Sequence, residues 1–171
     1  MLKVFYSDQY INSKTFLFYV FEKYFNLKLN EKDIIINKYG KPYLNNNLYY
    51  NISHTANIIV IAVSNNEIGI DAELLTRKIS DTLINKYFKN EYENTFDIIK
   101  LWTKKESFVK YLGKSMFTEI KNIKIKENLI IYKNEVVNIN SFNYTINNIY
   151  INIITNESNF EFINLNKKIT D

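Results

Sequence analysis

Two β-branched, apolar runs joined by a short polar turn, Asn57–Val63 and Asn66–Glu73, constrain the fold of this chain more than any other feature. Runs of this length and composition predict strands, and the turn between them predicts a hairpin. The second run ends in two acids, Asp71 and Glu73. Side chains two positions apart leave the same face of a strand, so these carboxylates should point together.

Helices are predicted on both sides of the hairpin. In Ser13–Leu27 the large apolar side chains recur at helical spacing, and either Asn12 or Ser13 is suited to cap the first turn. Two more helices are expected at Ile79–Phe88 and Thr95–Leu112. The chain should therefore place helices around a central pair of strands.

The remaining segments are strand-like, apart from a predicted loop at Lys38–Asn47 that contains the only proline, Pro42. Short β-branched runs predict further strands at Ile34–Asn37, Tyr49–Ser53, Ile123–Lys126, Leu129–Lys133, Ser141–Ile146, Ile149–Thr155 and Phe160–Ile163. Because the helices lie between two groups of mostly antiparallel strands, the expected fold class is α+β.

The composition narrows the function. With 46% hydrophobic residues and little glycine or proline, 171 residues are enough for one well-filled domain. The absence of cysteine and the single histidine argue against thiolate chemistry and zinc sites. A net charge of +4 is too weak to indicate nucleic acid binding. No run approaches the roughly 20 apolar residues of a membrane span, and no signal segment is recognisable, so we expect a cytoplasmic protein that does not bind membranes.

A further acid lies in the last predicted helix, within Trp102–Lys110. Glu106 and Lys110 are one turn apart there and share a face. If Glu106 meets the two acids of the hairpin, the three carboxylates would form an oxygen-rich site suited to magnesium, and the lysine could neutralise a phosphate. Each feature also has a simpler interpretation. Strand ends that face water often carry acids, and exposed Glu–Lys pairs of this spacing contribute only about 0.2–0.5 kcal/mol.

Two other positions could contact a ligand. His54, the only histidine, follows Ser53 at the end of a predicted strand. It is either a hydrogen-bonded structural residue, a donor to a phosphate or a general base. Lys41 lies between Gly40 and Pro42. By default it is a solvated lysine, but the adjacent glycine would let a ligand approach the backbone closely.

The order of these motifs resembles that of the 4′-phosphopantetheinyl transferases of the Sfp type. The resemblance covers roughly Lys38–Lys126 and rests on four segments: Gly40-Lys41-Pro42, Asn51–His54, Gly69–Glu73, and Trp102–Lys110 with Gly113-Lys114. It implies transfer of phosphopantetheine from coenzyme A to a serine of an apo acyl or peptidyl carrier protein, with release of adenosine 3′,5′-bisphosphate, in fatty acid or secondary metabolite biosynthesis. It also implies two similar α/β halves about a pseudo-twofold axis. Here these would be two subdomains, about residues 1–66 and 67–171, of a single domain with coenzyme A between them.

The resemblance also implies a role for each matched residue. Magnesium on the coenzyme A pyrophosphate would be held by Asp71, Glu73 and Glu106. Glu106 would also accept the proton of the carrier serine, and Lys110 would stabilise the pyrophosphate charge, so both are the expected catalytic residues. Glu91 resembles a further acidic position that assists. The other coenzyme contacts would come from Lys14 at the 3′-phosphate, Ser53 and His54 at the other phosphates, and Gly40, Lys41 and Pro42 at the adenine.

Two departures from the family pattern affect binding. The N-terminal half is shorter than usual, which leaves Lys14 as the one basic residue that aligns with the 3′-phosphate clamp. The interval from Asp71 to Glu106 is also shorter, which trims the region that docks the carrier. Two other functions stay open: a different magnesium enzyme, such as a nuclease or phosphohydrolase, and a non-catalytic relative that binds a carrier. Since two halves in one chain suffice for a site, we expect a monomer.

Overall fold

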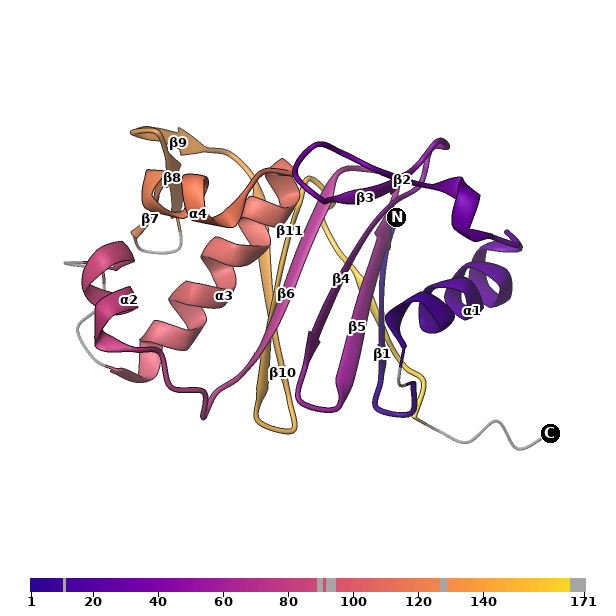
Figure 1. Ribbon diagram of the computed structural model, residues 1–171, viewed down its shortest axis with the longest axis horizontal. Helices are drawn as coiled ribbons and strands as arrows, with labels where there is room; N and C mark the ends of the chain where they lie inside the picture. Colours follow the sequence, from indigo (N-terminus) through magenta and orange to yellow (C-terminus); the bar gives the residue numbers. More distant parts are fainter. Residues whose placement is uncertain (11, 89–90, 92–94, 127–128, 167–171) are drawn as a thin grey trace.

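The computed structural model describes residues 1–10, 12–88, 91, 95–126 and 129–166, and it stacks helix, sheet, sheet and helix as layers (Figure 1). The first sheet has the order β12 (Glu161–Asn164), β1 (Leu2–Ser7), β5 (Ile58–Ser64) and β4 (Tyr49–Thr55). The second has the order β10 (Asn140–Ile146), β11 (Ile149–Thr155) and β6 (Ile68–Leu74). Neighbouring strands are antiparallel except β1 and β12, which are parallel. The mixed α/β architecture agrees with the predicted pattern.

The main core lies between the two sheets and follows the two-residue period of the strands. Alternate side chains of each central strand enter it, including Val60 on β5, Ile70 on β6 and Ile151 on β11, all fully buried. Burying one such side chain contributes about 1.5–3 kcal/mol. The same alternation turns Asp71 and Glu73 to the opposite face of β6, toward the outer helix layer.

Helix α1 (Ser13–Phe25) covers the outer face of the first sheet (Figure 1). Its buried stripe of Phe16, Leu17, Val20 and Phe21 packs on the side chains of β1 and β5 that point away from the main core. The Asn12 side chain caps the helix by accepting from the backbone N–H of Lys14 at 2.8 Å. The predicted helix and one of its two expected caps are confirmed.

Helix α3 (Thr95–Leu112) covers the outer face of the second sheet. It can approach β6 closely because Gly69 has no side chain, since a Cβ there would lie 1.9 Å from the backbone oxygen of Ser107. Gly113 ends the helix with a φ of +60°, and the N–H of Lys114 donates to the oxygen of Val109 at 3.3 Å. The helix bounds and the terminal glycine match their prediction.

The two sheets meet where β4 runs beside β6 (Figure 1). Strands β4 and β6 belong to different sheets, and side-chain hydrogen bonds join the two strands. Asn51 Oδ1 accepts from the N–H of Ile70 at 2.8 Å, and Ser53 Oγ accepts from the N–H of Ala72 at 3.1 Å. Two polar side chains of β4 therefore satisfy buried backbone donors of β6.

Smaller elements complete the fold. Beside α3 lie α2 (Asp81–Tyr87), α4 (Met116–Glu119) and a sheet of β7 (Ile123–Lys126), β8 (Leu129–Tyr132) and β9 (Glu135–Val137). Short 3₁₀ turns occur at Glu31–Asp33 and Ile120–Asn122. Strands β1 and β9 and helix α4 were not predicted. Within the described ranges, no helix combines the length and the apolarity needed to cross a membrane.

The predicted loop at Lys38–Asn47 is wrong in part, because it contains strand β3 (Pro42–Leu44). This strand pairs antiparallel with β2 (Ile34–Ile36) in a two-stranded sheet of its own. Proline is tolerated at a strand start, where its missing N–H is not needed. The division into subdomains at about residue 66 stays a prediction, although β12 returns from the end of the chain to pair with β1.

Candidate active site

A pocket of about 360 Å³ opens between β4, β6 and α3. It is lined by Ile52, Ser53, His54, Asp71, Ala72, Glu73, Arg77, Trp102, Glu106 and Lys110. The three acids predicted to meet do so: one carboxylate oxygen from each of Asp71, Glu73 and Glu106 lies within 4.8 Å of the others. Alternation along β6 and the close approach of α3 at Gly69 produce this convergence.

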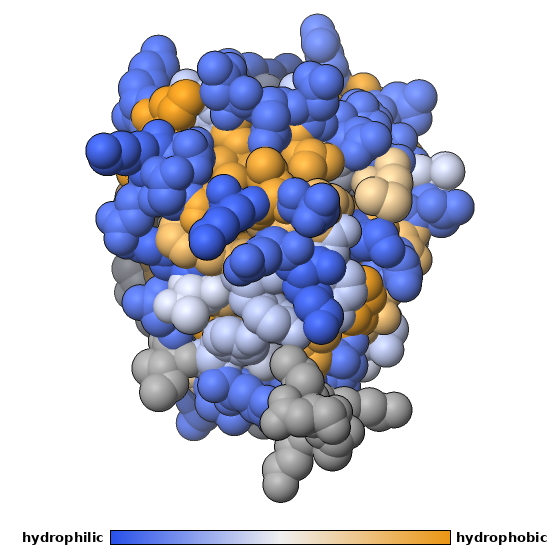
Figure 2. Space-filling model, turned by 90° about the vertical axis from the view of Figure 1, so that its right-hand side faces the viewer, coloured by the Kyte–Doolittle hydropathy of each residue, from blue (hydrophilic) through white to orange (hydrophobic). Residues whose placement is uncertain are grey.

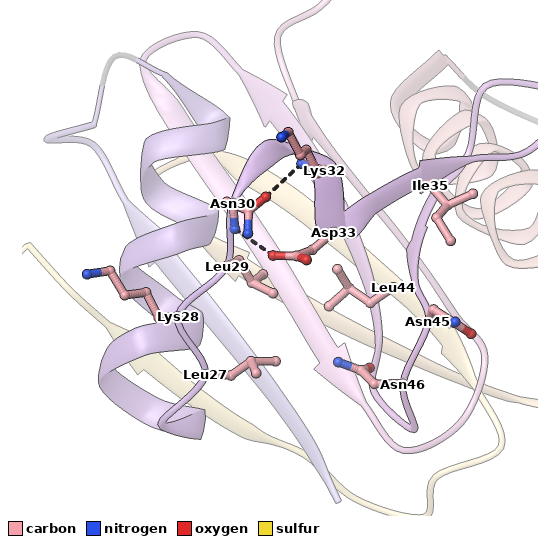
Figure 3. A pocket seen from close by; sticks show the side chains of 10 residues that line it. All are labelled: Leu27, Lys28, Leu29, Asn30, Lys32, Asp33, Ile35, Leu44, Asn45 and Asn46. Carbon is pink, nitrogen blue, oxygen red and sulfur yellow. Dashed lines mark hydrogen bonds between the residues drawn. The ribbon is translucent and has the colours of Figure 1, made fainter.

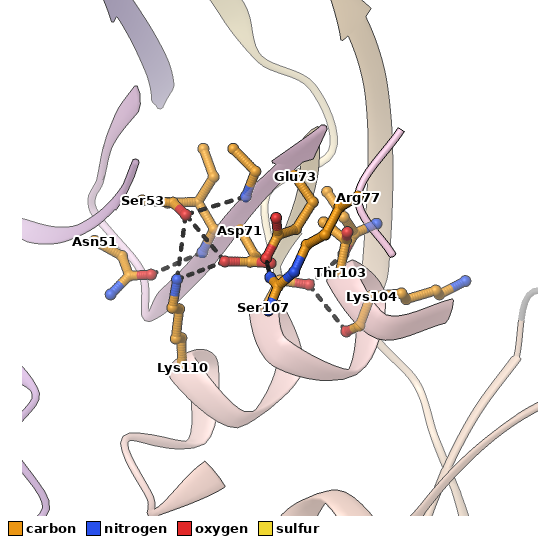
Figure 4. A network of polar contacts seen from close by, with 12 residues as sticks. Asn51, Ser53, Asp71, Glu73, Arg77, Thr103, Lys104, Ser107 and Lys110 are labelled. Carbon is orange, nitrogen blue, oxygen red and sulfur yellow. Dashed lines mark hydrogen bonds and ion pairs between the residues drawn. The ribbon is translucent and has the colours of Figure 1, made fainter. Parts of the chain in front are cut away.

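Asp71 is the most enclosed of these acids, and it is 3% exposed (Figure 4). Its Oδ1 accepts from Lys110 Nζ at 2.7 Å and from Ser53 Oγ at 2.9 Å. Its Oδ2 is buried and has no hydrogen-bond partner. An unpartnered buried carboxylate oxygen is costly, and a cation would satisfy it. The donor set therefore fits a hard divalent ion such as magnesium.

Glu73 is held from the other side by a cation. Its Oε1 forms an ion pair with Arg77, which lies in the turn after β6 (Figure 4). The Arg77 guanidinium also lies over the indole ring of Trp102 on α3, 5.6 Å from the ring centroid. Arg77 was not predicted as a site residue. Its position four residues after Glu73, as the only arginine of the chain, was the available signal.

Glu106 lies one helical turn from both Trp102 and Lys110. Burial, reinforced by the negative charge of Asp71 and opposed by Lys110, raises the pKa of Glu106 to about 7. A carboxylate with a pKa near neutrality can both hold and release a proton under physiological conditions. The pocket therefore combines Glu106, which can accept a proton near neutral pH, with two further carboxylates and a lysine.

The remaining predicted coenzyme contacts lie around this pocket. His54 is exposed at its rim and also lines an adjacent hollow of about 380 Å³ that reaches Ser13. Lys14, the next residue of α1, is exposed and forms an ion pair with Glu31 at 2.9 Å. Ser53 lies inside the pocket wall, where Lys110 Nζ donates to its Oγ at 3.3 Å.

The Gly40-Lys41-Pro42 segment borders a different hollow of about 310 Å³, which Lys41 and Pro42 line together with Tyr43 and Tyr49. The ammonium group of Lys41 forms its bonds within the protein. Its Nζ donates to Glu67 Oε2 at 2.7 Å and to the backbone oxygens of Ile68 and Tyr111 at 3.1 and 3.2 Å. Gly40 has a φ of +90° and open space where a Cβ would lie.

Glu91, which was expected to assist the acids, does not line the pocket. Its Oε1 pairs with Lys105 Nζ at 2.8 Å, and its Oε2 accepts from the N–H of Ile125 at 3.2 Å. Lys105 is fully buried and also donates to the backbone oxygen of Tyr87 at 3.0 Å. These contacts give Glu91 a structural position between α3 and β7.

A larger hollow of about 520 Å³ lies apart from this pocket, between the end of α1 and β3 (Figure 3). Figure 2 shows this side, where apolar residues gather between polar ones. The lining is Leu27, Lys28, Leu29, Asn30, Lys32, Asp33, Ile35, Leu44, Asn45 and Asn46. None of the predicted site residues belongs to it. Asn30 and Asp33 there cap each other's backbone N–H groups within the 3₁₀ turn.

Known proteins similar to this chain share one activity name. The chain is 34% identical over 110 residues to "4′-phosphopantetheinyl transferase gsp" of Aneurinibacillus migulanus, and the match covers 57% of this chain and 46% of the relative. It is 31% identical over 113 residues to "4′-phosphopantetheinyl transferase Sfp" of Bacillus subtilis (strain 168), covering 58% and 50%. Another "4′-phosphopantetheinyl transferase" of Bacillus subtilis is 30% identical over 102 residues, covering 53% and 46%. No protein-family model matches the chain.

The chain thus spans about half the length of the curated relatives it matches. The relatives' names agree with the resemblance that four ordered motifs indicated. Over more than half of its residues, this chain is similar to the 4′-phosphopantetheinyl transferases, Sfp among them.

Proposed function

We propose that the protein transfers 4′-phosphopantetheine from coenzyme A to a serine hydroxyl of an apo acyl or peptidyl carrier protein. The other product is adenosine 3′,5′-bisphosphate, and the reaction depends on magnesium. One observation carries the proposal: three carboxylates and Lys110 share a pocket in which one carboxylate oxygen is buried without a partner. The activity named for the relatives supports the choice of substrates.

The metal would be held by Asp71, Glu73 and Glu106, whose oxygens already lie within 4.8 Å of one another. When bound, magnesium neutralises charge on the pyrophosphate and makes the nucleotide a better leaving group. Lys110 holds its ammonium group 2.7 Å from Asp71 Oδ1, at the edge of the same pocket. From there it stabilises negative charge that develops on a pyrophosphate oxygen.

Glu106 acts as the proton acceptor for the carrier serine. Its raised pKa matches a base that must work near neutral pH. The serine oxygen then attacks the phosphorus of the pantetheine-bearing phosphate, and the bond from that phosphorus to the bridging oxygen breaks. The serine proton passes to Glu106, and the bridging oxygen leaves with the adenosine bisphosphate.

The rest of coenzyme A would extend from this pocket along the first sheet. His54 borders both the pocket and the hollow next to α1, which supports a contact of its ring with a phosphate, with Lys14 near the same end of the helix. Pro42, the stem of Lys41 and the adjoining Gly40 would face the adenine. We also propose that the two sheets with their helices are halves related by a pseudo-twofold axis, within one monomeric, cytoplasmic domain.

The proposal is tested by following adenosine 3′,5′-bisphosphate in a mixture of the purified protein, coenzyme A, magnesium and an apo-carrier. We expect product only when the carrier is present, because a hydrolase would release nucleotide without it. Asp71→Ala and Glu106→Gln should abolish the release of adenosine 3′,5′-bisphosphate, while the far-UV circular dichroism spectrum stays that of the wild-type protein. Full activity in Glu106→Gln would contradict its role as the base, and nucleotide release without a carrier would indicate a phosphohydrolase.

A further inference from the structure

The only arginine of the chain lies inside the candidate active site. Every other cationic side chain is lysine, apart from one histidine. Arg77 follows β6, and its backbone N–H donates to the oxygen of Leu74 at 2.9 Å, which fixes the turn. Its guanidinium pairs with Glu73 (Figure 4), and it lies over the ring of Trp102. A planar cation suits both contacts better than an ammonium group does.

This arrangement places Arg77 on a carboxylate group that the proposed metal site needs. Glu73 Oε1 accepts from the guanidinium, and Glu73 is one of the three converging acids. Two unit charges of the same sign a few ångströms apart repel each other strongly in a partly buried site. A divalent ion and the guanidinium therefore cannot both occupy the space beside Glu73.

Arg77 is the partner that can move. Its side chain is 44% exposed, whereas that of Glu73, on strand β6, is 10% exposed. Lys110 cannot leave as easily, because its ammonium group is bonded to both Asp71 and Ser53. An arginine in a surface turn can rotate into water at small cost, since its charge is then hydrated.

We infer that Arg77 is an internal counter-ion for the acidic site, and that a divalent cation binds by displacing its guanidinium from Glu73 and from the face of Trp102. The inference rests on the proposed magnesium site. In the metal-free protein Arg77 limits repulsion among the three carboxylates. Metal binding then releases the guanidinium to the rim of the pocket, where it faces any anionic ligand.

Tryptophan fluorescence can report the displacement. Trp102 is the only tryptophan of the chain, and its ring is the one over which Arg77 lies. Departure of the guanidinium changes the charge beside the indole, so tryptophan emission should change as metal binds. The same change should be smaller when residue 77 carries no charge.

The test is a titration with magnesium chloride, without coenzyme A, followed by calorimetry and by tryptophan emission. Wild type is compared with Arg77→Ala and with Lys78→Ala, which removes an exposed charge at the next position. We expect Arg77→Ala to bind magnesium on the order of tenfold more tightly, as removal of a nearby like charge implies. Its metal-dependent emission change should be smaller than that of wild type, and Lys78→Ala should behave as wild type.

The outcomes separate the inference from the proposed function. Binding that is equal in wild type and Arg77→Ala would overturn the inference and leave the metal site intact. Binding in Arg77→Ala with none in wild type would show that the guanidinium blocks the site and is not displaced by magnesium, and would overturn the inference. A lack of magnesium binding in every variant, with each protein folded, would overturn the inference, whereas the proposed function falls only if nucleotide release from coenzyme A with a carrier also fails. An equal gain in magnesium affinity in Lys78→Ala would show that the effect comes from general surface charge, and it would also overturn the inference.

Discussion

Glu106 has two proposed duties in this site, and both follow from where its carboxylate lies. It is close enough to Asp71 and Glu73 to share a cation with them. Burial and the neighbouring charge of Asp71 also hold its pKa near neutrality, so it can accept a proton. The first duty favours the charged form, and the metal-free pocket favours the neutral form. Stability should therefore respond to pH and to metal together.

The pH dependence has a definite sign. The pKa of Glu106 rises from an ordinary value of 4.5 to about 7 on folding. A raised pKa means that the folded state binds the proton more tightly, so this contribution is present below pH 4.5 and is lost as pH rises through about 7. In the presence of a chelator, urea unfolding of wild type should show falling stability across this window.

Glu106→Gln supplies the control, because glutamine stays neutral at every pH. Its stability should fall less across the same window than that of wild type. Identical pH profiles for the two proteins would show that the carboxyl group of Glu106 is not protonated preferentially in the folded state.

At the scale of elements, the site depends on how closely α3 lies on β6. Gly69 is the point of contact, and neighbouring atoms leave no room there for a side chain. The strand supplies two acids and the helix supplies the third acid and Lys110, so a displaced helix would separate them. The short distance between the elements is thus both a packing feature and a requirement of the chemistry.

Gly69→Ala tests this dependence. The new Cβ would lie 1.9 Å from Ser107 O and 2.4 Å from Tyr111 N, so the helix must shift. Overpacking of this kind costs about 1–3 kcal/mol or more of unfolding free energy, and magnesium binding should weaken as the acids move apart. Gly40→Ala is the matched control. Its φ of +90° adds strain, but nothing lies within 4 Å of the new Cβ, so metal binding should persist. Unchanged stability in Gly69→Ala would contradict the close approach.

The sequence predicted these two elements well because their signals are local. The β-branched apolar runs of β5 and β6 and the helical stripe of α3 lie within single segments. Strand β3 was missed because it begins with a proline and has polar residues on both sides, and its pairing with β2 depends on residues outside the segment. Arg77 was missed as a site residue for a similar reason, since only the turn after β6 brings it back to Glu73.

At the scale of the whole molecule, Lys41 shows how a ligand motif can also hold the fold together. Its ammonium group joins the segment before β3 to the start of β6 and the end of α3. The partner oxygens of Ile68 and Tyr111 lie 27 and 70 residues away. No local pattern could have predicted these contacts. A contact between Lys41 and the adenine therefore stays a prediction, and it would be made by the aliphatic part of the side chain and by the backbone.

Lys41→Met separates the two roles. Methionine keeps the length of the side chain but cannot donate, so buried carbonyl groups lose a partner at a cost of about 1–3 kcal/mol. Thermal or urea unfolding should show this loss, whereas Lys38→Met, in an exposed position of the same loop, should be near neutral. Equal stability of the two variants would show that the three contacts of Lys41 do not stabilise the fold.

The measurement that tests the central claim most directly is the intact mass of apo-carrier proteins after incubation with the purified protein, coenzyme A and magnesium. A panel of acyl and peptidyl carriers is needed, because the segment expected from the family resemblance to dock the carrier is shorter here than is usual. We predict that at least one carrier gains the mass of a single phosphopantetheine group, and that Asp71→Ala abolishes the gain. If no carrier gains this mass, although a reference transferase modifies the same panel and the protein is folded, the proposed transferase activity is contradicted.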